Sequence, residues 1–175
     1  SWGSYLMKNE LIFTVEGPFD VPLEKGSKGI FIKHNCPEFW NSCQNLAEER
    51  GCYVFAIRAG KGFRPIYVGK TKNTFRKECF APHKISQHYT PAILNGKGSP
   101  VMFLLIAERR KGGPNETAIK DLESFLIKEA SKKNPKLSNI QQNRERKWAI
   151  KGLIGGGRAK TSTAATTFKK AVGIK

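Results

Sequence analysis

Apolar residues along the first two thirds of the chain fall into short runs bounded by turn-forming residues. Three runs cover 52–58, 63–68 and 100–107, and a glycine-rich segment, 59–62, joins the first run to the second. Such runs are typical of strands, and a glycine-rich connection of this length is typical of a hairpin. We therefore predict a β-hairpin followed by a third strand. Two shorter strands are predicted at 10–15 and 29–33.

Other segments show the three-to-four-residue spacing of helices. Apolar positions recur at this spacing in 37–50, between Pro37 and Gly51, and again in 116–133, after Asn115. Proline favours the first helical turn, glycine follows helix ends, and asparagine is a common N-cap. We predict an amphipathic helix over each segment. Further predictions are a short basic helix at 71–80, a polar linker at 83–99 and a small helix around 164–172.

Charge is distributed unevenly along the chain. The 31 Lys and Arg residues exceed the 14 Asp and Glu residues, which gives a net charge of +17. Residues 1–50 hold five basic and seven acidic residues, so residues 51–175 carry the whole excess. Because each phosphate that a protein neutralises releases counterions, this asymmetry favours nucleic acid as the partner. A solvated basic surface or a ribosome-associated protein is the alternative.

The composition excludes several classes of protein. With 175 residues, of which 39% are hydrophobic, the chain suits one globular domain. It has neither an apolar run near the length of a membrane span nor the pattern of a secretory signal, so we expect no membrane partner. The four cysteines lack zinc-site spacing, and we expect buried, reduced thiols in a cytoplasmic protein. These cysteines are Cys36, Cys43, Cys52 and Cys79.

Two glycine-containing segments resemble phosphate-binding loops only superficially. Gly69-Lys70-Thr71 matches the end of such a loop, but Arg64 stands where the loop requires its first glycine. The glycines at 155–157 follow no predicted strand, so a flexible linker is the simpler interpretation. Neither segment indicates a nucleotide site.

One carboxylate occupies an unusual place on the predicted 116–133 helix. On a wheel of 100° per residue, Glu123 lies in the centre of the apolar stripe, beside Ile119, Leu126, Ile127 and Ala130. Burying an unpaired charge costs several kcal/mol, so this carboxylate needs a partner. Two interpretations are equally open, namely an ion pair with a Lys or Arg at the edge of the stripe and a metal or catalytic site.

Four short motifs in order resemble those of the GIY-YIG nuclease family. Gly51-Cys52-Tyr53 and Tyr67-Val68-Gly69 stand on consecutive predicted strands, and each departs from the family signature only at its aliphatic middle position. Arg76 follows on the predicted basic helix, and Glu123 follows on the long helix. Asn139, in the segment 137–140, also fits the pattern. The resemblance covers about residues 51–140.

The resemblance implies a mixed α/β (α+β) fold with a small central three-stranded antiparallel sheet flanked by helices. Residues 51–140 would form the nuclease core, with 1–50 as a strand and helix extension packed on it. Residues 141–175 would form a basic C-terminal helix or tail, within a single folded domain overall.

The resemblance further implies a metal-dependent endonuclease that hydrolyses phosphodiester bonds of DNA. Glu123 would hold one Mg²⁺ or Mn²⁺ ion, and Arg76 would clamp the scissile phosphate. Tyr53 is the family's candidate base, and Tyr67 would assist by hydrogen bonding. His83 or His88 could instead be the base or a phosphate contact, with a surface histidine as the alternative.

The expected contacts to nucleic acid extend from the core into the tail. The partner would be double-stranded or branched DNA, and the alternative function is a non-catalytic DNA- or RNA-binding protein that retained the fold. In the tail, the basic residues surround Trp148, for which core packing is the simpler interpretation. The expected contact residues are Gly69, Lys70, Lys72, Lys77, His88, Asn139, Arg144, Lys147, Lys151, Arg158, Lys160, Lys169 and Lys170.

Overall fold

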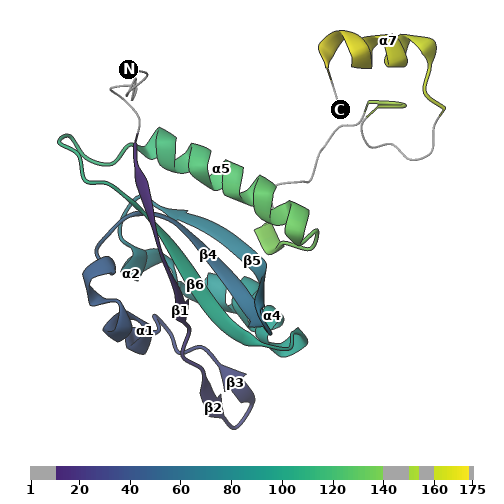
Figure 1. Cartoon of the computed structure of the whole chain (residues 1–175). Helices are drawn as coiled ribbons and strands as arrows, with labels where there is room; N and C mark the ends of the chain where they lie inside the picture. Colours follow the sequence, from purple (N-terminus) through teal and green to yellow (C-terminus); the bar gives the residue numbers. More distant parts are fainter. Residues whose placement is uncertain (1–10, 140–149, 154–159, 174–175) are drawn as a thin grey trace. The chain divides into compact units, whose positions relative to one another are not determined.

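A computed structural model describes residues 11–139, 150–153 and 160–173 of the chain (Figure 1). The chain divides into two compact units, residues 1–141 and 142–175, and each is described by itself. No helix in the described ranges combines the length and the apolar character that crossing a bilayer requires.

A mixed α+β fold with an antiparallel sheet, as predicted, forms the first unit. Its sheet has four strands in the order β1-β6-β4-β5. The predicted hairpin and third strand are confirmed, since β4 pairs with both β5 and β6. These strands are β1 (Phe13–Asp20), β4 (Gly51–Ala59), β5 (Gly62–Thr71) and β6 (Ser99–Ala107).

The sheet has one strand more than the three expected for the core, because β1 of the N-terminal extension adds a fourth. It pairs antiparallel with β6, with Val15 opposite Leu105 and Asp20 opposite Val101. The strand begins later and runs further than the predicted 10–15, since the exposed edge of β6 offers backbone groups that another strand can satisfy. A separate small hairpin joins β2 (Glu24–Gly26) to β3 (Gly29–Phe31), so the second predicted N-terminal strand is shorter than 29–33.

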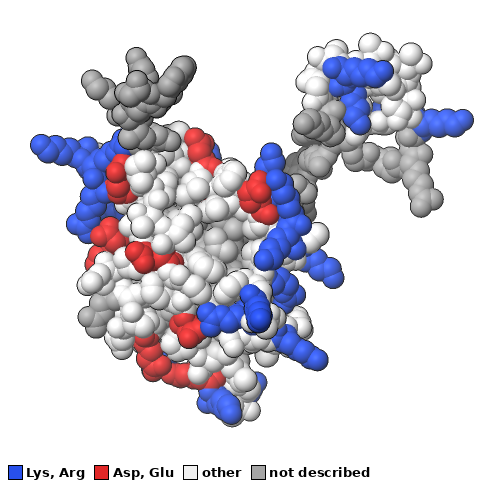
Figure 2. Space-filling view, viewed as in Figure 1, with Lys and Arg blue, Asp and Glu red and all other residues white. Residues whose placement is uncertain are grey.

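Helix α5 (Glu116–Lys133) covers one face of the sheet and has the predicted bounds. Asn115 caps it as expected, since its side-chain oxygen accepts a hydrogen bond from the Ala118 backbone N–H at 3.0 Å. The helix packs through Ile119 against Cys52 of β4, whose thiol donates to the Ile119 carbonyl. Figure 2 shows Lys and Arg side chains gathered where α5 ends. The exposed lysines of that stretch are Lys128, Lys132, Lys133 and Lys136.

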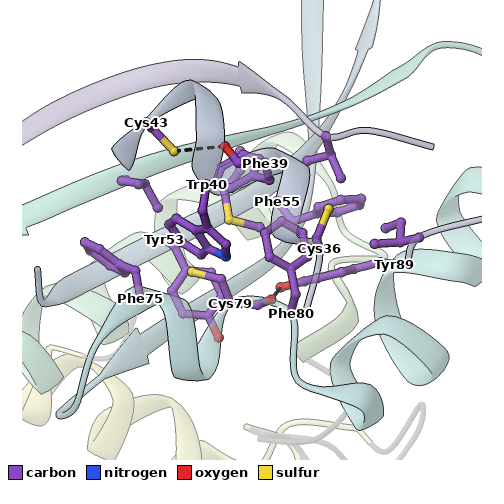
Figure 3. Close-up of a cluster of buried hydrophobic side chains, with 14 of the residues drawn as sticks. Cys36, Phe39, Trp40, Cys43, Tyr53, Phe55, Phe75, Cys79, Phe80 and Tyr89 are labelled. Atoms are coloured by element: carbon purple, nitrogen blue, oxygen red, sulfur yellow. Dashed lines mark hydrogen bonds between the residues drawn. The ribbon is translucent and has the colours of Figure 1, made fainter. Parts of the chain in front are cut away.

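The opposite face of the sheet carries a larger, aromatic core (Figure 3). Phe55 of β4 stacks on Tyr89 at 4.1 Å between ring centroids, and Phe39 meets Phe80 edge-on. All four cysteines are free and buried, as predicted for reduced thiols, and burial raises the pKa of each. This packing makes the thiols small hydrophobic side chains rather than reactive groups.

Two of the predicted helices, which the structure places on this face, are shorter than expected. The segment 37–50 forms only α1 (Pro37–Ser42) and the 3₁₀ turn η1 (Gln44–Leu46), because Cys43 leaves the helical conformation between them. The basic helix of 71–80 is reduced to α2 (Phe75–Glu78), since Thr71 still belongs to β5 and Thr74 is the N-cap.

The predicted polar linker 83–99 is largely helical, so that expectation is wrong. The chain forms α3 (Pro82–Lys84), the π-helix η2 (Ile85–Tyr89) and α4 (Thr90–Asn95) in succession. The consecutive residues His88 and Tyr89 of η2 are both buried. Packing against the aromatic core thus stabilises this helical segment, which its polar sequence did not indicate.

The second unit contains α7 (Thr163–Val172), which confirms the small helix predicted around 164–172. The Ser162 hydroxyl accepts a hydrogen bond from the Ala165 backbone N–H at 3.1 Å and caps its start. Gly173, with a φ of 74°, ends it in the left-handed conformation that glycine favours.

Candidate functional site

Strand β5 lies at the edge of the sheet, and the candidate site is built around that edge. Tyr67 belongs to the aromatic face of the sheet, whereas Lys70 meets α5 on the other face. With no strand beyond β5 within the described residues, side chains from both faces meet at this edge. We call the group formed by Tyr67, Lys70, His88 and Glu123 the β5 rim.

The carboxylate of Glu123 pairs with the ammonium of Lys70. Lys70 Nζ lies 2.7 Å from Glu123 Oε2, with the two side chains 33% and 18% exposed. Of the two interpretations open for Glu123, the ion pair is therefore formed. The second carboxylate oxygen, Oε1, has no hydrogen-bond partner in the described part of the chain, which leaves it able to take a ligand.

Tyr53 lies directly behind the β5 rim, against the backbone of Gly69. The two residues are opposite each other in the β4–β5 pair. Tyr53 is fully buried, and its hydroxyl has no hydrogen-bond partner within the described ranges. Its ring lies 6.2 Å from that of Tyr67, centroid to centroid. The motif residues Tyr53, Tyr67 and Gly69 are thus brought together.

Both tyrosines keep their protons at neutral pH. Burial raises the pKa of Tyr53 well above its usual value, and neighbouring groups add to the effect. The pKa of Tyr67 rises to about 12, first through burial and then through the negative charge of Glu123. The ion pair between Lys70 and Glu123 brings this negative charge to β5, although strand and helix are far apart in sequence. Each phenol is therefore a hydrogen-bonding group here rather than a phenolate base.

His88 packs on the ring of Tyr67 and is buried. The two ring centroids lie 4.4 Å apart, and His88 Nδ1 hydrogen-bonds with the Ser138 hydroxyl. Burial lowers the pKa of His88, and the nearby positive charges of His83 and Lys84 lower it further. A neutral imidazole follows at pH 7. His83 is exposed, so of the two histidines only His88 belongs to the rim.

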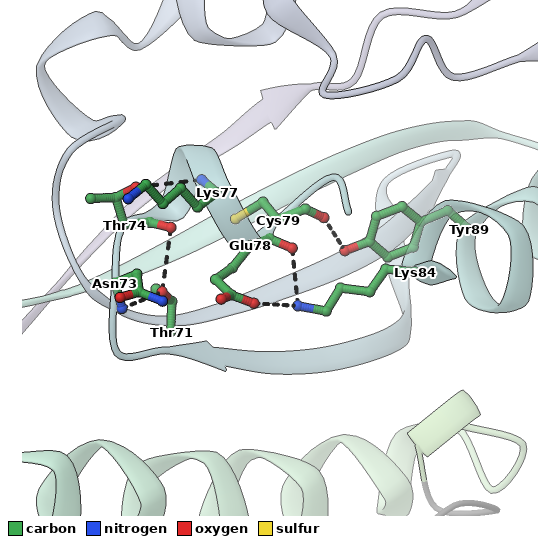
Figure 4. A network of polar contacts seen from close by, with 8 residues as sticks. All are labelled: Thr71, Asn73, Thr74, Lys77, Glu78, Cys79, Lys84 and Tyr89. Carbon is green, nitrogen blue, oxygen red and sulfur yellow. Dashed lines mark hydrogen bonds and ion pairs between the residues drawn. The ribbon is translucent and has the colours of Figure 1, made fainter. Parts of the chain in front are cut away.

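An ion pair between the buried Lys84 and the partly exposed Glu78, near the Tyr53 ring, escaped the sequence analysis. Lys84 Nζ donates to the Glu78 carbonyl at 3.0 Å and lies 3.2 Å from its carboxylate (Figure 4). The same ammonium lies 5.3 Å from the centre of the Tyr53 ring, a cation–π arrangement. The one available signal was Pro82, which begins a helix that points Lys84 inward.

Arg76 pairs with an acid that is not part of the β5 rim. Its guanidinium donates to Glu48 Oε1 at 2.8 Å, and both side chains are at least half exposed. Within the described residues, no hydrogen bond or ion pair links Arg76 to Tyr67 or Glu123. Lys77 is exposed beside it, and Lys72 lies 3.8 Å from Glu116. The expected clamp residue is therefore paired with Glu48 and not with another motif residue of the described chain.

Asn139 has a structural role in the sheet. Val68 N–H donates to Asn139 Oδ1 at 3.1 Å, and the Asn139 amide donates to the Val68 carbonyl. The side chain is buried and both of its polar atoms are used. It fixes the outer edge of β5 beside the rim, a role that differs from the expected contact with nucleic acid.

The predicted tail contacts belong to the second unit. Lys151, Lys160, Lys169 and Lys170 are all exposed there, as phosphate contacts need to be. The remaining tail residues of the sequence analysis lie outside the described residues, and these are Arg144, Lys147, Trp148 and Arg158.

The described residues contain no group of three or more His, Cys, Asp or Glu side chains that could hold a metal ion. No family model, curated protein or solved structure matches the chain.

Any metal at the β5 rim would have Glu123 as its one acidic ligand. Mg²⁺ accepts such a site, because it retains several waters and takes oxygens from a substrate phosphate.

Proposed function

We propose that the protein is a metal-dependent endonuclease that hydrolyses phosphodiester bonds of DNA, with the β5 rim as its reaction centre. The observation that supports the proposal best is the ion pair between Lys70 of β5 and Glu123 of α5, which brings the carboxylate to the strand that carries Tyr67. The order of Tyr67 and Glu123 along the chain, together with Tyr53 and Gly69 behind them, follows the GIY-YIG resemblance. The strong positive charge supports a polyanionic substrate.

One Mg²⁺ or Mn²⁺ ion fits the donor set at the rim. Glu123 Oε1 is without a partner in the described part of the chain, and a carboxylate oxygen is the ligand type that these hard cations prefer. When bound there, the ion supplies stabilisation of the charge that develops on the leaving oxygen.

The other rim residues bind and orient the substrate in this proposal. Lys70 supplies positive charge for a phosphate oxygen, at the cost of its bond to Glu123. The neutral Tyr67 hydroxyl donates a hydrogen bond, and His88, neutral and packed on the Tyr67 ring, holds that ring in place. Arg76 contributes only after its guanidinium leaves Glu48, an exposed partner that a phosphate can replace.

Cleavage of supercoiled plasmid tests the proposal. Wild type with Mg²⁺ or Mn²⁺ should nick the plasmid, EDTA should abolish nicking, and Glu123→Gln should lose it. Glu129→Gln is the matched control, since Glu129 lies on the same helix and pairs with Lys132 at the same 2.7 Å distance but in solvent. Equal nicking by all variants would identify a contaminant.

A second function, non-catalytic binding of DNA or RNA, is favoured by a specific observation. The two charged residues that the chemistry needs, Arg76 and Glu123, are each neutralised by another residue of the chain. A protein that only binds would show salt-dependent affinity for nucleic acid and no cleavage of duplex, single-stranded, branched or RNA substrates. It would also be indifferent to Glu123→Gln in binding assays that contain metal.

A further inference from the structure

The Lys70–Glu123 ion pair lies beside a cavity of which three of the six lining residues are lysines. The cavity has a volume of about 410 Å³ and lies between the end of β5 and the first turns of α5. Glu123 follows Ile119 of its lining by one helical turn. The lining residues are Lys70, Lys72, Glu116, Thr117, Ile119 and Lys120.

The charges of this region are unbalanced in favour of an anion. The lining holds three lysines against Glu116 alone, and Glu116 lies 3.8 Å from Lys72. Lys120 makes no ion pair within the described residues. A phosphate group has the size, charge and acceptor oxygens for such a lining.

The ion pair itself opposes the binding of a single ion. A cation that approaches Glu123 meets the ammonium of Lys70 at 2.7 Å, and an anion that approaches Lys70 meets the carboxylate. Both side chains are at most one-third exposed, so separating them leaves each charge poorly solvated. A cation and a phosphate that enter together replace both halves of the pair at once.

We propose that the Lys70–Glu123 pair is the closed form of a joint site for a divalent cation and a phosphodiester group. The cation binds Glu123, and the phosphate binds Lys70 and the adjoining cavity. Neither ion binds well alone, because a lone cation meets the ammonium of Lys70 and a lone phosphate meets the carboxylate of Glu123. This inference rests on the proposed function for the identity of the two ions. Its consequence is that each ligand increases the affinity for the other, as thermodynamic linkage requires.

Two binding measurements on separate variants test the joint site without any cleavage. Lys70→Met removes the competing ammonium, so Mn²⁺ alone, followed by electron paramagnetic resonance without nucleic acid, should bind about tenfold tighter than to wild type. Lys132→Met, which removes the exposed partner of Glu129, should leave Mn²⁺ affinity unchanged. Equal Mn²⁺ affinity of wild type and Lys70→Met would overturn the proposal, as would no binding by either.

The second measurement follows a fluorescent duplex in EDTA at fixed salt. Glu123→Gln frees Lys70 and should bind the duplex about threefold tighter than Glu129→Gln, which removes an equal charge from an exposed pair. Equal affinity of these two variants would overturn the proposal. The double variant Lys70→Met/Glu123→Gln leaves neither charge unpaired, so it should melt at the same temperature as wild type. It should bind Mn²⁺ and the duplex no more tightly than wild type does.

The outcomes separate this inference from the proposed function. Tighter Mn²⁺ binding by Lys70→Met, combined with a wild type that never nicks plasmid, would support the joint site and reject the nuclease. Metal-dependent nicking by wild type, combined with unchanged affinities in both variants, would reject the joint site and support the nuclease.

Discussion

The ring of Tyr53 occupies the space where a side chain at position 69 would lie. A Cβ atom on Gly69 would come within 2.3 Å of Tyr53 Cζ and 2.5 Å of its hydroxyl oxygen. The glycine of the second motif is therefore needed for packing against the tyrosine of the first. The two motifs are parts of one contact, which explains why both can be present in a chain whether or not it cleaves nucleic acid.

Gly69→Ala should destabilise the protein through this contact. The added methyl group overlaps a fully buried ring, and relief requires Tyr53 or β5 to move. We expect a loss of about 1–3 kcal/mol in the free energy of unfolding, measured with urea. Gly62→Ala is the control on the same strand, since its nearest contact would be at 3.8 Å. Equal losses in the two variants would contradict the packing argument.

Asn139→Ala should loosen β5 specifically. The change leaves the backbone N–H and carbonyl of Val68 without their side-chain partner, at a cost of about 2–4 kcal/mol in unfolding free energy. Amide hydrogen exchange should show faster exchange at Val68. Asn41→Ala, at an exposed position of α1, is the control and should change neither stability nor exchange. Unchanged protection of Val68 in Asn139→Ala would contradict the proposed role.

His88 should make stability depend on pH below neutrality. Its pKa is lowered from 6.5 in the folded chain, so the unfolded chain takes up the proton first. The contribution is complete above about pH 6.5 and is lost as the pH falls towards the lower folded value. Thermal melts of His88→Gln between pH 7.5 and 5 should show a smaller decline than wild type. His34→Gln, which alters an exposed histidine that does not act on His88, should decline as wild type does.

Tyr67 should make stability depend on pH in the alkaline range. Its pKa of about 12 in the folded chain lies above the usual 10.0, so the unfolded chain releases the proton first. The contribution is complete below pH 10 and is lost as the pH rises from about 10 to about 12. Tyr67→Phe should therefore show a shallower fall in unfolding free energy above pH 10. The same steepness in both proteins would mean that Tyr67 is more accessible than its position implies.

Glu48→Gln should strengthen nucleic-acid binding by freeing Arg76. The pair is exposed, so its own contribution to stability is small and melting should hardly change. We expect about twofold tighter binding of a fluorescent duplex. Glu38→Gln removes an exposed acid from α1 without an ion-pair partner in the described ranges and serves as the control. No difference between the two would show that Arg76 does not bind phosphate.

The strands and the long helix could be predicted because their signals are local. The β4–β5 hairpin follows from two apolar runs around a glycine turn, and α5 follows from its periodicity and its asparagine cap. The aliphatic periodicity placed Glu123 near the apolar stripe, but only the fold shows that Lys70 reaches it. Pairing between residues so distant in sequence is a property of tertiary packing.

The errors arose where tertiary packing overrode a local signal. The segment around His88 looked polar, yet the aromatic core draws its rings inward. The long helix expected after Pro37 ends early because Cys43 turns into the core. The role expected for Arg76 stays a prediction, and the structure adds that its exposed side chain pairs with Glu48. Spacing along the chain does not determine where a long, exposed side chain points.

The π-helix η2 has a consequence for the length of its segment. Its i→i+5 hydrogen bonds give a wider turn than an α-helix has, and His88 and Tyr89 are both buried at its end. Deleting one residue of 85–87 would shift Pro82–Lys84 by one position relative to these two rings, unless the rings themselves moved. If the rings moved, Tyr67 would lose the imidazole packed on its ring, or Phe55 would lose the ring stacked on it. The number of residues between Pro82 and α4 is thus itself a structural requirement of the fold.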